Sequence, residues 1–479
     1  MTRSIDKFQL GAFALLGTVT ITSVLAAFGF EMYYLAFIPF VLLIAGLAVV
    51  NFKSIYFLLL FAIPLSIEYY FSSSLATDLP DEPLMIGLML VTMVYLARNP
   101  KALPTGFFGH FIIVALLIHL FWIFVTAITS VNTLVSIKVW ISKIWYITTF
   151  SILTVLVLKT KEDFKKAFWC IFAPLSLLVV QVLVRYALIH FDFDEVNKPM
   201  PPFFRNHVNY AAIITIFFPF ILLVRSWYPK GLLRNVLNAG VVLFLVGIYF
   251  SYTRTCYLAV GFILPFYLVV RYRLMKLALV GVGIGIIGLS YYLEHNNKYL
   301  DFAPEFTETT VHDEFGEHLV ATFQGKDVSS MERVYRWVAI GHMFQDRPWF
   351  GFGAGNFYPY YKDYTVRVFE TYVSENEEHS TAHNYPLLLL AEQGVIGVFI
   401  FFFLTAVIFI KGENIYHSID DKTDKAIVLT LLVIMAMVYI NLMLSDLVES
   451  DKVGPFFFMV IGLLAAFDIK HRLLKAKAE

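Results

Sequence analysis

Long runs of hydrophobic residues, separated by short polar stretches, dominate the chain. A membrane-spanning helix needs about 20 mainly apolar residues. On that basis we place candidate spans over residues 9–29, 32–51, 54–72, 82–98, 107–129, 140–158, 167–188, 208–225, 235–252, 255–271, 274–292, 383–410, 426–446 and 453–469. The pattern predicts an all-α polytopic membrane protein with about 12–14 transmembrane helices.

Composition supports a lipid-embedded chain. Hydrophobic residues make up 59% of the sequence and charged residues 15%, against roughly 45–50% and about 25% in soluble proteins. The apolar runs are long and do not alternate with polar residues, which excludes an outer-membrane barrel. Arg3 and Lys7 precede the first run as in a secretory signal. Because that run is longer than a signal core and leads into another, we interpret residues 9–29 as a retained first helix.

The distribution of positive charge predicts the orientation. With the N-terminus inside, the expected cytoplasmic segments hold 22 of the 36 lysines and arginines. The short outer loops hold Lys138, Lys198, Arg205, Arg254 and Lys452. This asymmetry is typical of an inner-membrane protein. Span 82–98 is the weakest, but omitting it would place the lysine cluster at 159–166 outside, so the charge pattern favours a crossing. The net charge of zero gives no indication of a nucleic-acid partner.

Residues 293–382 form a single large loop on the outer, periplasmic side in this topology. The loop carries 15 acidic residues against seven lysines and arginines. Ser329 and Glu332 have capping-box spacing, and an amphipathic helix is expected from Arg333 to Phe344. The chain thus divides into N-terminal spans (1–200), spans with arginine motifs (201–292), the loop with short helices (293–382) and C-terminal spans (383–479).

Two arginines at the outer face are candidates for chemistry. Arg205 lies just before the span at 208–225 and is either an ordinary interfacial anchor or a ligand contact. Arg254 lies in a tight turn between two apolar spans, with little loop in which to reach water. A buried guanidinium requires a carboxylate or phosphate partner and can bind two oxygens at once. A structural ion pair with Glu68 or Glu392 is the alternative.

His383 and Glu392 belong to the span that begins at residue 383. A neutral histidine at the outer surface can accept a proton from a sugar hydroxyl, but a helix cap or a solvated side chain is an equally ordinary role. Glu392 lies inside the membrane, where an ionisable residue is costly. A structural partnership with a buried cation is the preferred interpretation of Glu392.

The segment from Gly351 to Phe357 contains three glycines and superficially matches a dinucleotide-binding motif. Without a preceding strand or a βαβ unit, it is interpreted as a turn. Neither Cys170 nor Cys256 is placed for a disulfide, and no spacing of ligands indicates a metal site. We therefore expect no metal and no cofactor.

Four stretches carry a family resemblance. They are FRNHVNYAA at 204–212, SYTRT at 251–255, Arg333 to Trp337 followed by DRPWFGFGAGNF at 346–357, and His383-Asn384-Tyr385 followed by Glu392-Gln393-Gly394. With these stretches, over roughly residues 200–410, the chain resembles the O-antigen ligase and polymerase family. Its members move glycans from undecaprenyl diphosphate outside the bacterial cytoplasmic membrane. The 14 predicted spans exceed the twelve or so typical of the ligases.

The resemblance implies roles for individual residues. Arg205 and Arg254 would bind the diphosphate and stabilise its developing charge, and His383 would activate the acceptor hydroxyl for inverting displacement. The remaining candidates for substrate binding are Arg333, Asn384, His207 and Glu392. The implied partners are the lipid-linked glycan donor, membrane lipid, and an acceptor that is lipid A core, another glycan or a protein.

Several functions remain open at this stage. O-antigen ligation to lipopolysaccharide, polymerisation and transfer to protein hydroxyls all use the same donor chemistry and differ in the acceptor. Ligation is slightly preferred, because the matching stretches most resemble those of ligases. A flippase or exporter is the main rival, but transporters usually show repeats and interrupted helices near mid-membrane. A metal-dependent glycosyltransferase is a third possibility, distinguishable by its sensitivity to a chelator.

Overall fold

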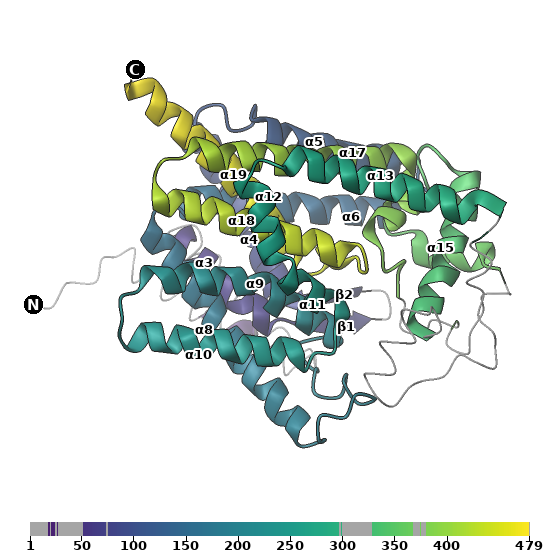
Figure 1. The fold of residues 1–479 in the computed structure, drawn as a ribbon, viewed down its shortest axis with the longest axis horizontal. Helices are drawn as coiled ribbons and strands as arrows, with labels where there is room; N and C mark the ends of the chain where they lie inside the picture. Colours follow the sequence, from purple (N-terminus) through teal and green to yellow (C-terminus); the bar gives the residue numbers. More distant parts are fainter. Residues whose placement is uncertain are drawn as a thin grey trace, which may run out of the picture.

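The computed structural model describes residues 51–72, 75–296, 328–366 and 380–478, with isolated positions at 18, 19, 21–23, 26, 298 and 374. Most of these residues are helical, as Figure 1 shows. The helices are α3 (Phe52–Ala62), α4 (Asp81–Arg98), α5 (Phe111–Ile128), α6 (Thr133–Tyr146), α7 (Thr154–Val157), α8 (Lys161–Ala187), α9 (His207–Trp227), α10 (Leu232–Tyr249), α11 (Arg254–Gly261), α12 (Ile263–Arg271), α13 (Met275–Glu294), α15 (Val328–Asp346), α16 (Phe357–Tyr360), α17 (Tyr385–Ser418), α18 (Lys422–Leu442) and α19 (Gly454–Ala478).

The predicted class, an all-α polytopic membrane protein, is confirmed. Within the described part of the chain, nine helical segments are long and apolar enough to cross a membrane. A π-helical stretch over Ile147–Leu153 joins α6 and α7 into one of them. Helix α4 covers the predicted span 82–98, and α19 begins one residue inside the predicted span 453–469, but neither helix is among these nine segments. The predicted spans 9–29 and 32–51 lie outside the described residues.

The predicted span at 54–72 is wrong in its second half. Helix α3 ends at Ala62, and a 3-10 turn containing Pro64 follows. The chain then forms an antiparallel hairpin of β1 (Ile67–Ser72) and β2 (Leu75–Leu79). Proline has no backbone N–H to donate, and aromatic residues such as those at 69–71 favour strands. This local chemistry ends the helix although the segment as a whole is rich in apolar residues.

Close helix packing forms the core. Phe168 and Phe172 of α8 stack on each other, and they stack in turn on Phe217 of α9 and Phe244 of α10. A Cβ atom at Gly240 of α10 would lie 2.6 Å from the Phe172 ring, so this glycine permits the close approach of α8 and α10. Along another side of the bundle, α5 packs against α17. No residue in the apolar stretch of α13 is buried in the protein, so this helix faces outward from the bundle.

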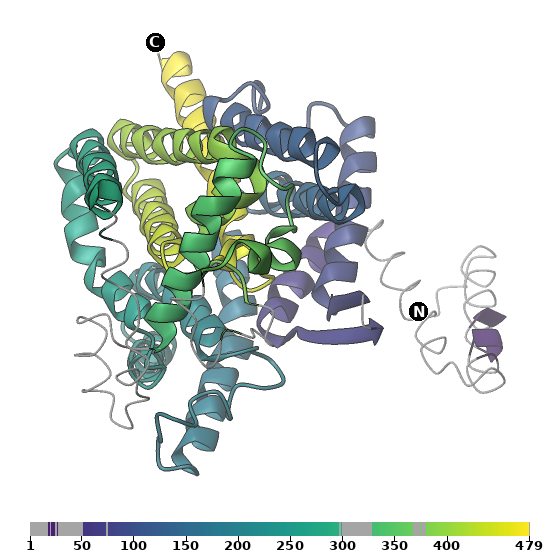
Figure 2. The same cartoon turned by 90° about the vertical axis from the view of Figure 1, so that its right-hand side faces the viewer.

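The segments expected on the outer side gather at one end of the bundle. The hairpin, α15, the connection before α9 and the connection between α18 and α19 all contribute to a single cavity there. We call this the hairpin end. It lies at the right of Figure 1 and faces the viewer in Figure 2. The predicted amphipathic helix at 333–344 is confirmed as part of α15, which begins at Val328, so that Ser329 lies inside the helix and is not its cap.

Candidate active site

A cavity of about 720 Å³ lies at the hairpin end. Both acidic and basic side chains line it: Glu68, Asp78, Arg205, His207, Arg333, His383, Asp446, Glu449, Asp451 and Lys452. Four of the seven residues predicted for the site are therefore brought together, namely Arg205, His207, Arg333 and His383. They come from three segments that are far apart in the sequence. The cavity combines cations that can bind a phosphate with an imidazole that can exchange a proton.

The connection that enters α9 positions Arg205 and His207. Asn206 is the N-cap of α9, and its side-chain oxygen accepts a hydrogen bond from the backbone N–H of Asn209 at 3.0 Å. The side-chain oxygen of Asn197 accepts from the backbone N–H of His207 at 3.0 Å and lies 2.8 Å from its Nδ1. Arg185 of α8 donates to the carbonyl of Pro201, which fixes the same connection. These bonds place Arg205 and His207 at the open N-terminus of α9, where the helix dipole also favours an anion.

The turn before α11 positions Arg254. This arginine is the first residue of α11 and follows a turn in which Ser251 donates to the carbonyl of Ile248 at 2.7 Å. The backbone N–H of Thr253 donates to the Ser251 hydroxyl at 3.3 Å and closes the turn. Among the described residues, Arg254 is not one of those that line the cavity, but its charge and that of Arg333 act on the His207 ring. Of the three arginines predicted for the site, Arg205 and Arg333 line the cavity, and Arg254 is near enough for its charge to act on His207.

His383 is held by contacts on both sides of it. Two groups of α15 anchor the preceding residues: Arg336 donates to the carbonyl of Thr381 at 3.2 Å, and Trp337 Nε1 donates to the carbonyl of Ala382 at 2.9 Å. Asn384, which follows His383, caps α17 by accepting from the N–H of Leu387 at 3.0 Å. Its side-chain nitrogen also donates to the carbonyl of Met443 at 2.9 Å.

His383 itself adopts a φ of +49°, a conformation that non-glycine residues rarely adopt. A residue held in such a conformation requires support from its surroundings, and such positions cluster at functional sites. The fixed neighbours on both sides give His383 that support. The geometry gives Asn384 a positioning role, since its side-chain contacts are to the protein backbone.

The surroundings of His383 keep its imidazole neutral. Burial, together with the positive charges of Arg333, Arg336 and Arg205, lowers the pKa of His383 from 6.5 to about 3. A neutral imidazole has a lone pair that can accept a proton from a hydroxyl group. An anion bound near these three positive charges would offset them and raise the pKa of His383 again.

Glu392 holds the glycine-rich turn. Its carboxylate, in α17, accepts a hydrogen bond from the backbone N–H of Phe357 at 3.1 Å. The N–H groups of Phe352 and Gly353 donate to the carbonyls of Ala391 and Glu392 at 2.9 and 2.8 Å. The expected turn over Gly351–Phe357 is confirmed, with positive φ at all three glycines. Glu392 therefore lies against this turn and outside the lining of the cavity as described. In the described part of the chain its carboxyl group accepts from a backbone N–H and forms no ion pair with the buried cation that was expected.

The glycine-rich turn fits into a kink of α17. Gly394 has φ +69° and ψ −174° inside the helix, and the backbone of Trp349 fills the gap that the kink opens. Asn356 ties the turn to the α5–α6 connection by donating to Ser130 and Ser136 at 2.9 and 2.8 Å. Together these contacts join α5, α6, α15 and α17, so they form part of the scaffold that holds His383.

Sequence reasoning missed the acidic side of the cavity. Asp446 accepts a hydrogen bond from the hydroxyl of Thr381, and burial raises the pKa of the Asp446 carboxyl. Glu449 pairs with Lys143 of α6, which is buried. Asp451 pairs with Lys452 at 3.0 Å. In the sequence, Glu68 was the one indication of this acidic group, because it interrupts the apolar run 54–72. The other carboxylates follow a predicted span and belong to no recognisable motif.

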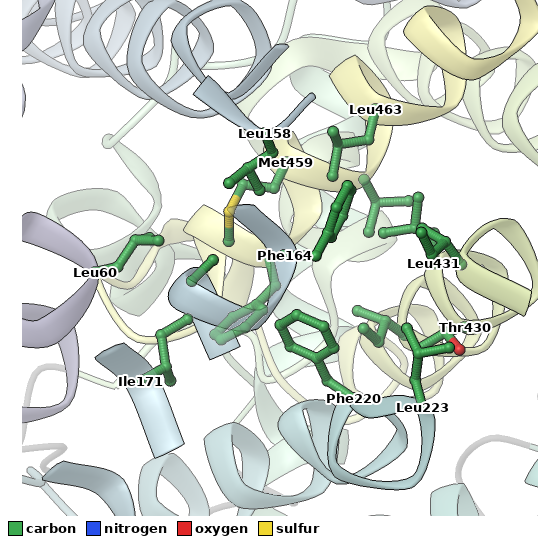
Figure 3. Close-up of a pocket in the computed structure, with 15 residues that line it drawn as sticks. Leu60, Leu158, Phe164, Ile171, Phe220, Leu223, Thr430, Leu431, Met459 and Leu463 are labelled. Carbon is green, nitrogen blue, oxygen red and sulfur yellow. The ribbon is translucent and has the colours of Figure 1, made fainter. Parts of the chain in front are cut away.

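A second, small cavity of about 40 Å³ lies among helices α3, α8, α9, α18 and α19 (Figure 3). Apolar side chains, including Leu60, Phe164, Phe220 and Met459, point into it, with Thr430 as the polar exception among the labelled residues. This lining offers no group for acid–base chemistry or for anion binding. Of these two cavities, the one at the hairpin end is the one that carries such groups. Within the described part of the chain, no three histidine, cysteine, aspartate or glutamate side chains are arranged to hold a metal ion.

Comparison with known proteins agrees with this arrangement. A search of curated proteins found no match to the chain. Residues 239–402 match the family model described as O-antigen ligase. This segment runs from α10 into α17 and includes Arg254, Arg333, His383, Asn384 and Glu392, whereas Arg205 and His207 precede it. The match supports the resemblance seen in the sequence and an enzyme of the O-antigen ligase and polymerase type, a family of membrane glycan transferases to which this chain is similar over that segment.

Proposed function

We propose that the protein is a glycosyltransferase of the bacterial inner membrane that transfers a glycan from undecaprenyl diphosphate to an acceptor hydroxyl on the periplasmic side. The observation that carries the proposal is the convergence of Arg205, Arg333, His207 and His383 on one cavity. The match to the O-antigen ligase family over residues 239–402 supports the same chemistry. The excess of positive charge on the opposite, cytoplasmic loops supports the periplasmic orientation.

The reaction is a single displacement. The acceptor oxygen attacks the anomeric carbon of the donor, and a new glycosidic bond forms as the bond between that carbon and the phosphate oxygen breaks. The acceptor proton passes to His383, and undecaprenyl diphosphate leaves with the bonding electron pair. Attack from the face opposite the leaving group inverts the anomeric centre.

The residues divide this work by their chemistry. Arg205, Arg254 and Arg333 stabilise the negative charge that grows on the diphosphate, and such electrostatic stabilisation is usually a large part of catalysis. Neutral His383 supplies the proton acceptor. Diphosphate is a good leaving group, so placement of charged groups supplies the catalysis that other transferases obtain from a metal ion.

Ligation of O-antigen to the lipid A core is the reaction that we favour, with polymerisation of repeat units and transfer to protein as alternatives that use the same donor. A flippase is less well supported, because the candidate charges gather at one end of the bundle and do not line a path through it. The alternatives differ in the acceptor and in the product that accumulates when the protein is missing.

The test is a gel of surface glycans from a strain that lacks the gene. Loss of long chains from lipid A, with long glycan accumulating on the lipid carrier, supports a ligase. A single repeat unit still attached to lipid A supports a polymerase. Normal patterns in both lipopolysaccharide and carrier-linked glycan would contradict the O-antigen assignment and direct the search to glycoproteins or another envelope polymer.

A further inference from the structure

The β1–β2 hairpin presents negative charge to the cavity. Glu68 and Asp78 are directly opposed in the register of the two strands, and both line the cavity together with Tyr70. Like charges at directly opposed positions destabilise a hairpin. Alternate residues of a strand face the same side, which accounts for Glu68 and Tyr70 sharing the face that borders the cavity. Because the opposed carboxylates destabilise the hairpin, their presence on the cavity wall suggests that they have a function there.

The region behind the hairpin holds more negative than positive charge. Asp451 pairs with Lys452 at 3.0 Å and accepts from the hydroxyl of Ser66. Lys452 also donates to the carbonyls of Ile63 and Ser66, at 2.8 and 2.9 Å. The three carboxylates Asp78, Asp81 and Asp451 therefore share one ammonium group that already has other acceptors.

Asp81 adds a third carboxyl group. Its side chain is fully buried, and its Oδ1 accepts from the backbone N–H of Glu82 at 3.0 Å. Its charge acts on those of Asp451 and Asp78. Burial and the charges of Asp451 and Glu82 raise the pKa of Asp78 to about 7. Near neutral pH the Asp78 carboxyl is therefore partly protonated, and the region offers closely spaced carboxyl groups that exchange hydrogen bonds with hydroxyl groups.

Resting on the proposed transferase function, we propose that Glu68, Tyr70 and Asp78 form the acceptor subsite and that it selects an uncharged, hydroxyl-rich sugar over a phosphorylated one. Carboxylates accept hydrogen bonds from sugar hydroxyls, and these charge-assisted bonds are stronger than neutral ones. Tyr70, which is 62% exposed, offers an aromatic face for the apolar side of a sugar ring.

The hairpin and α15 reach the cavity from different directions. Residues of the hairpin and Arg333 of α15 both line it, and in Figure 2 the hairpin (purple arrows) is to one side of α15 (green). Arg205 lies nearer the hairpin, since its charge acts on Tyr70. A displacement needs the acceptor and the leaving group on different sides of the anomeric carbon, and an acceptor at the hairpin with a diphosphate at Arg333 suits that requirement.

The experiment uses the purified full-length chain in lipid nanodiscs, with an undecaprenyl-diphosphate-linked glycan as donor. The acceptors are a neutral methyl glycoside and the same glycoside carrying a phosphate on another hydroxyl. Transfer rates and, separately, acceptor binding by calorimetry are measured for the wild type, Glu68→Gln and Asp78→Asn. Asp194→Asn, which removes an exposed carboxylate of the connection before α9 that does not line the cavity as described, is the matched control.

We expect the wild type to prefer the neutral glycoside, and each hairpin variant to raise the acceptor KM about tenfold while leaving the donor KM unchanged. The preference against the phosphorylated glycoside should shrink in both variants and persist in Asp194→Asn. Both substitutions remove charge repulsion, so folding should not suffer. An unchanged acceptor KM in both variants, or equal use of the two glycosides by the wild type, would overturn the subsite.

The binding measurement separates this inference from the proposed function. Selective binding of the neutral glycoside that is lost in Glu68→Gln, without any transfer by the wild type, would support the subsite and contradict the transferase. Normal transfer with no selectivity in binding or in rate would leave the transferase standing and refute the subsite.

Discussion

His383 and Arg205 line the same cavity, and the charge of Arg205 contributes to keeping the His383 imidazole neutral. One residue precedes α17 and the other precedes α9, so only the packed bundle brings them together. The relationship links the two halves of the proposed reaction. In the proposed mechanism, Arg205 binds the departing phosphate and also contributes to the low proton affinity of His383, which takes the proton of the acceptor hydroxyl.

Replacing Arg254 by lysine should reduce the rate of transfer by at least about 10²-fold, and replacing it by alanine should reduce the rate at least as much. Lysine keeps the positive charge but cannot bind two phosphate oxygens at once in the planar geometry of a guanidinium. Rates of glycan transfer in nanodiscs, compared at equal amounts of inserted protein, check this expectation. Near-normal activity of Arg254→Lys would show that only charge matters at this position.

Transfer should have an unusual pH dependence. Because the pKa of His383 in the free protein is lowered to about 3, its imidazole stays neutral above that value, and kcat/KM should be flat from about pH 5 to 8. The bound diphosphate offsets the arginine charges and raises the pKa, so kcat should fall in acid at a higher pH than kcat/KM does. A kcat/KM profile with a midpoint near the ordinary histidine value of about 6.5 would contradict this account of the site.

Trp337→Phe should lower kcat about tenfold with little change in the donor KM. The substitution removes the hydrogen bond from Trp337 Nε1 to the carbonyl of Ala382, which positions His383, but keeps an aromatic ring in the same place. The measurement is steady-state kinetics that determine kcat and the donor KM separately. If the loss were purely structural, the amount of folded protein would fall in parallel with activity, and thermal unfolding of the purified variant would reveal it.

Gly394→Ala should destabilise the protein by about 2–4 kcal/mol, since the new Cβ would lie 2.3 Å from the carbonyl oxygen of Trp349 at a residue with φ +69°. Gly341→Ala is the matched control. A Cβ at Gly341 of α15 meets nothing within 4 Å, so it should change stability by less than about 1 kcal/mol. Thermal unfolding in detergent compares the two variants. Equal effects would show that the kink of α17 does not depend on this glycine.

A chelator should leave transfer unchanged. The proposed mechanism uses arginine side chains for the charge on the diphosphate, and no group of metal-ligating side chains occurs in the described segments. Assays with and without EDTA, followed by addition of Mg²⁺ or Mn²⁺, check this. Loss of transfer that either metal restores would contradict the arginine-and-histidine mechanism.

The sequence predicted most helices, because runs of about 20 apolar residues have few alternatives in a membrane. It also predicted the helix at 333–344 and the glycine turn, whose signals are local. The hairpin was not predicted: the run at 54–72 is apolar enough for a span, and only Pro64 and Glu68 indicate otherwise.

The site was predicted in part. Arg205, Arg254 and His383 were predicted from their position at the outer face and from the family resemblance, and of these Arg205 and His383 line the cavity. The roles of Arg336, Trp337 and Asp446 arise from contacts between distant segments, which no local pattern encodes. The opposed carboxylates Glu68 and Asp78 become visible only once the register of the hairpin is known.

The most direct measurement is transfer by the purified full-length protein in nanodiscs, with undecaprenyl-diphosphate-linked glycan as donor and lipid A core as acceptor. Free undecaprenyl diphosphate and glycosylated acceptor are quantified together for the wild type, His383→Ala and Arg254→Lys. The account predicts that the wild type forms the two products one for one and that both variants form neither. Full transfer by His383→Ala, or release of the carrier without a glycosylated acceptor, would contradict it.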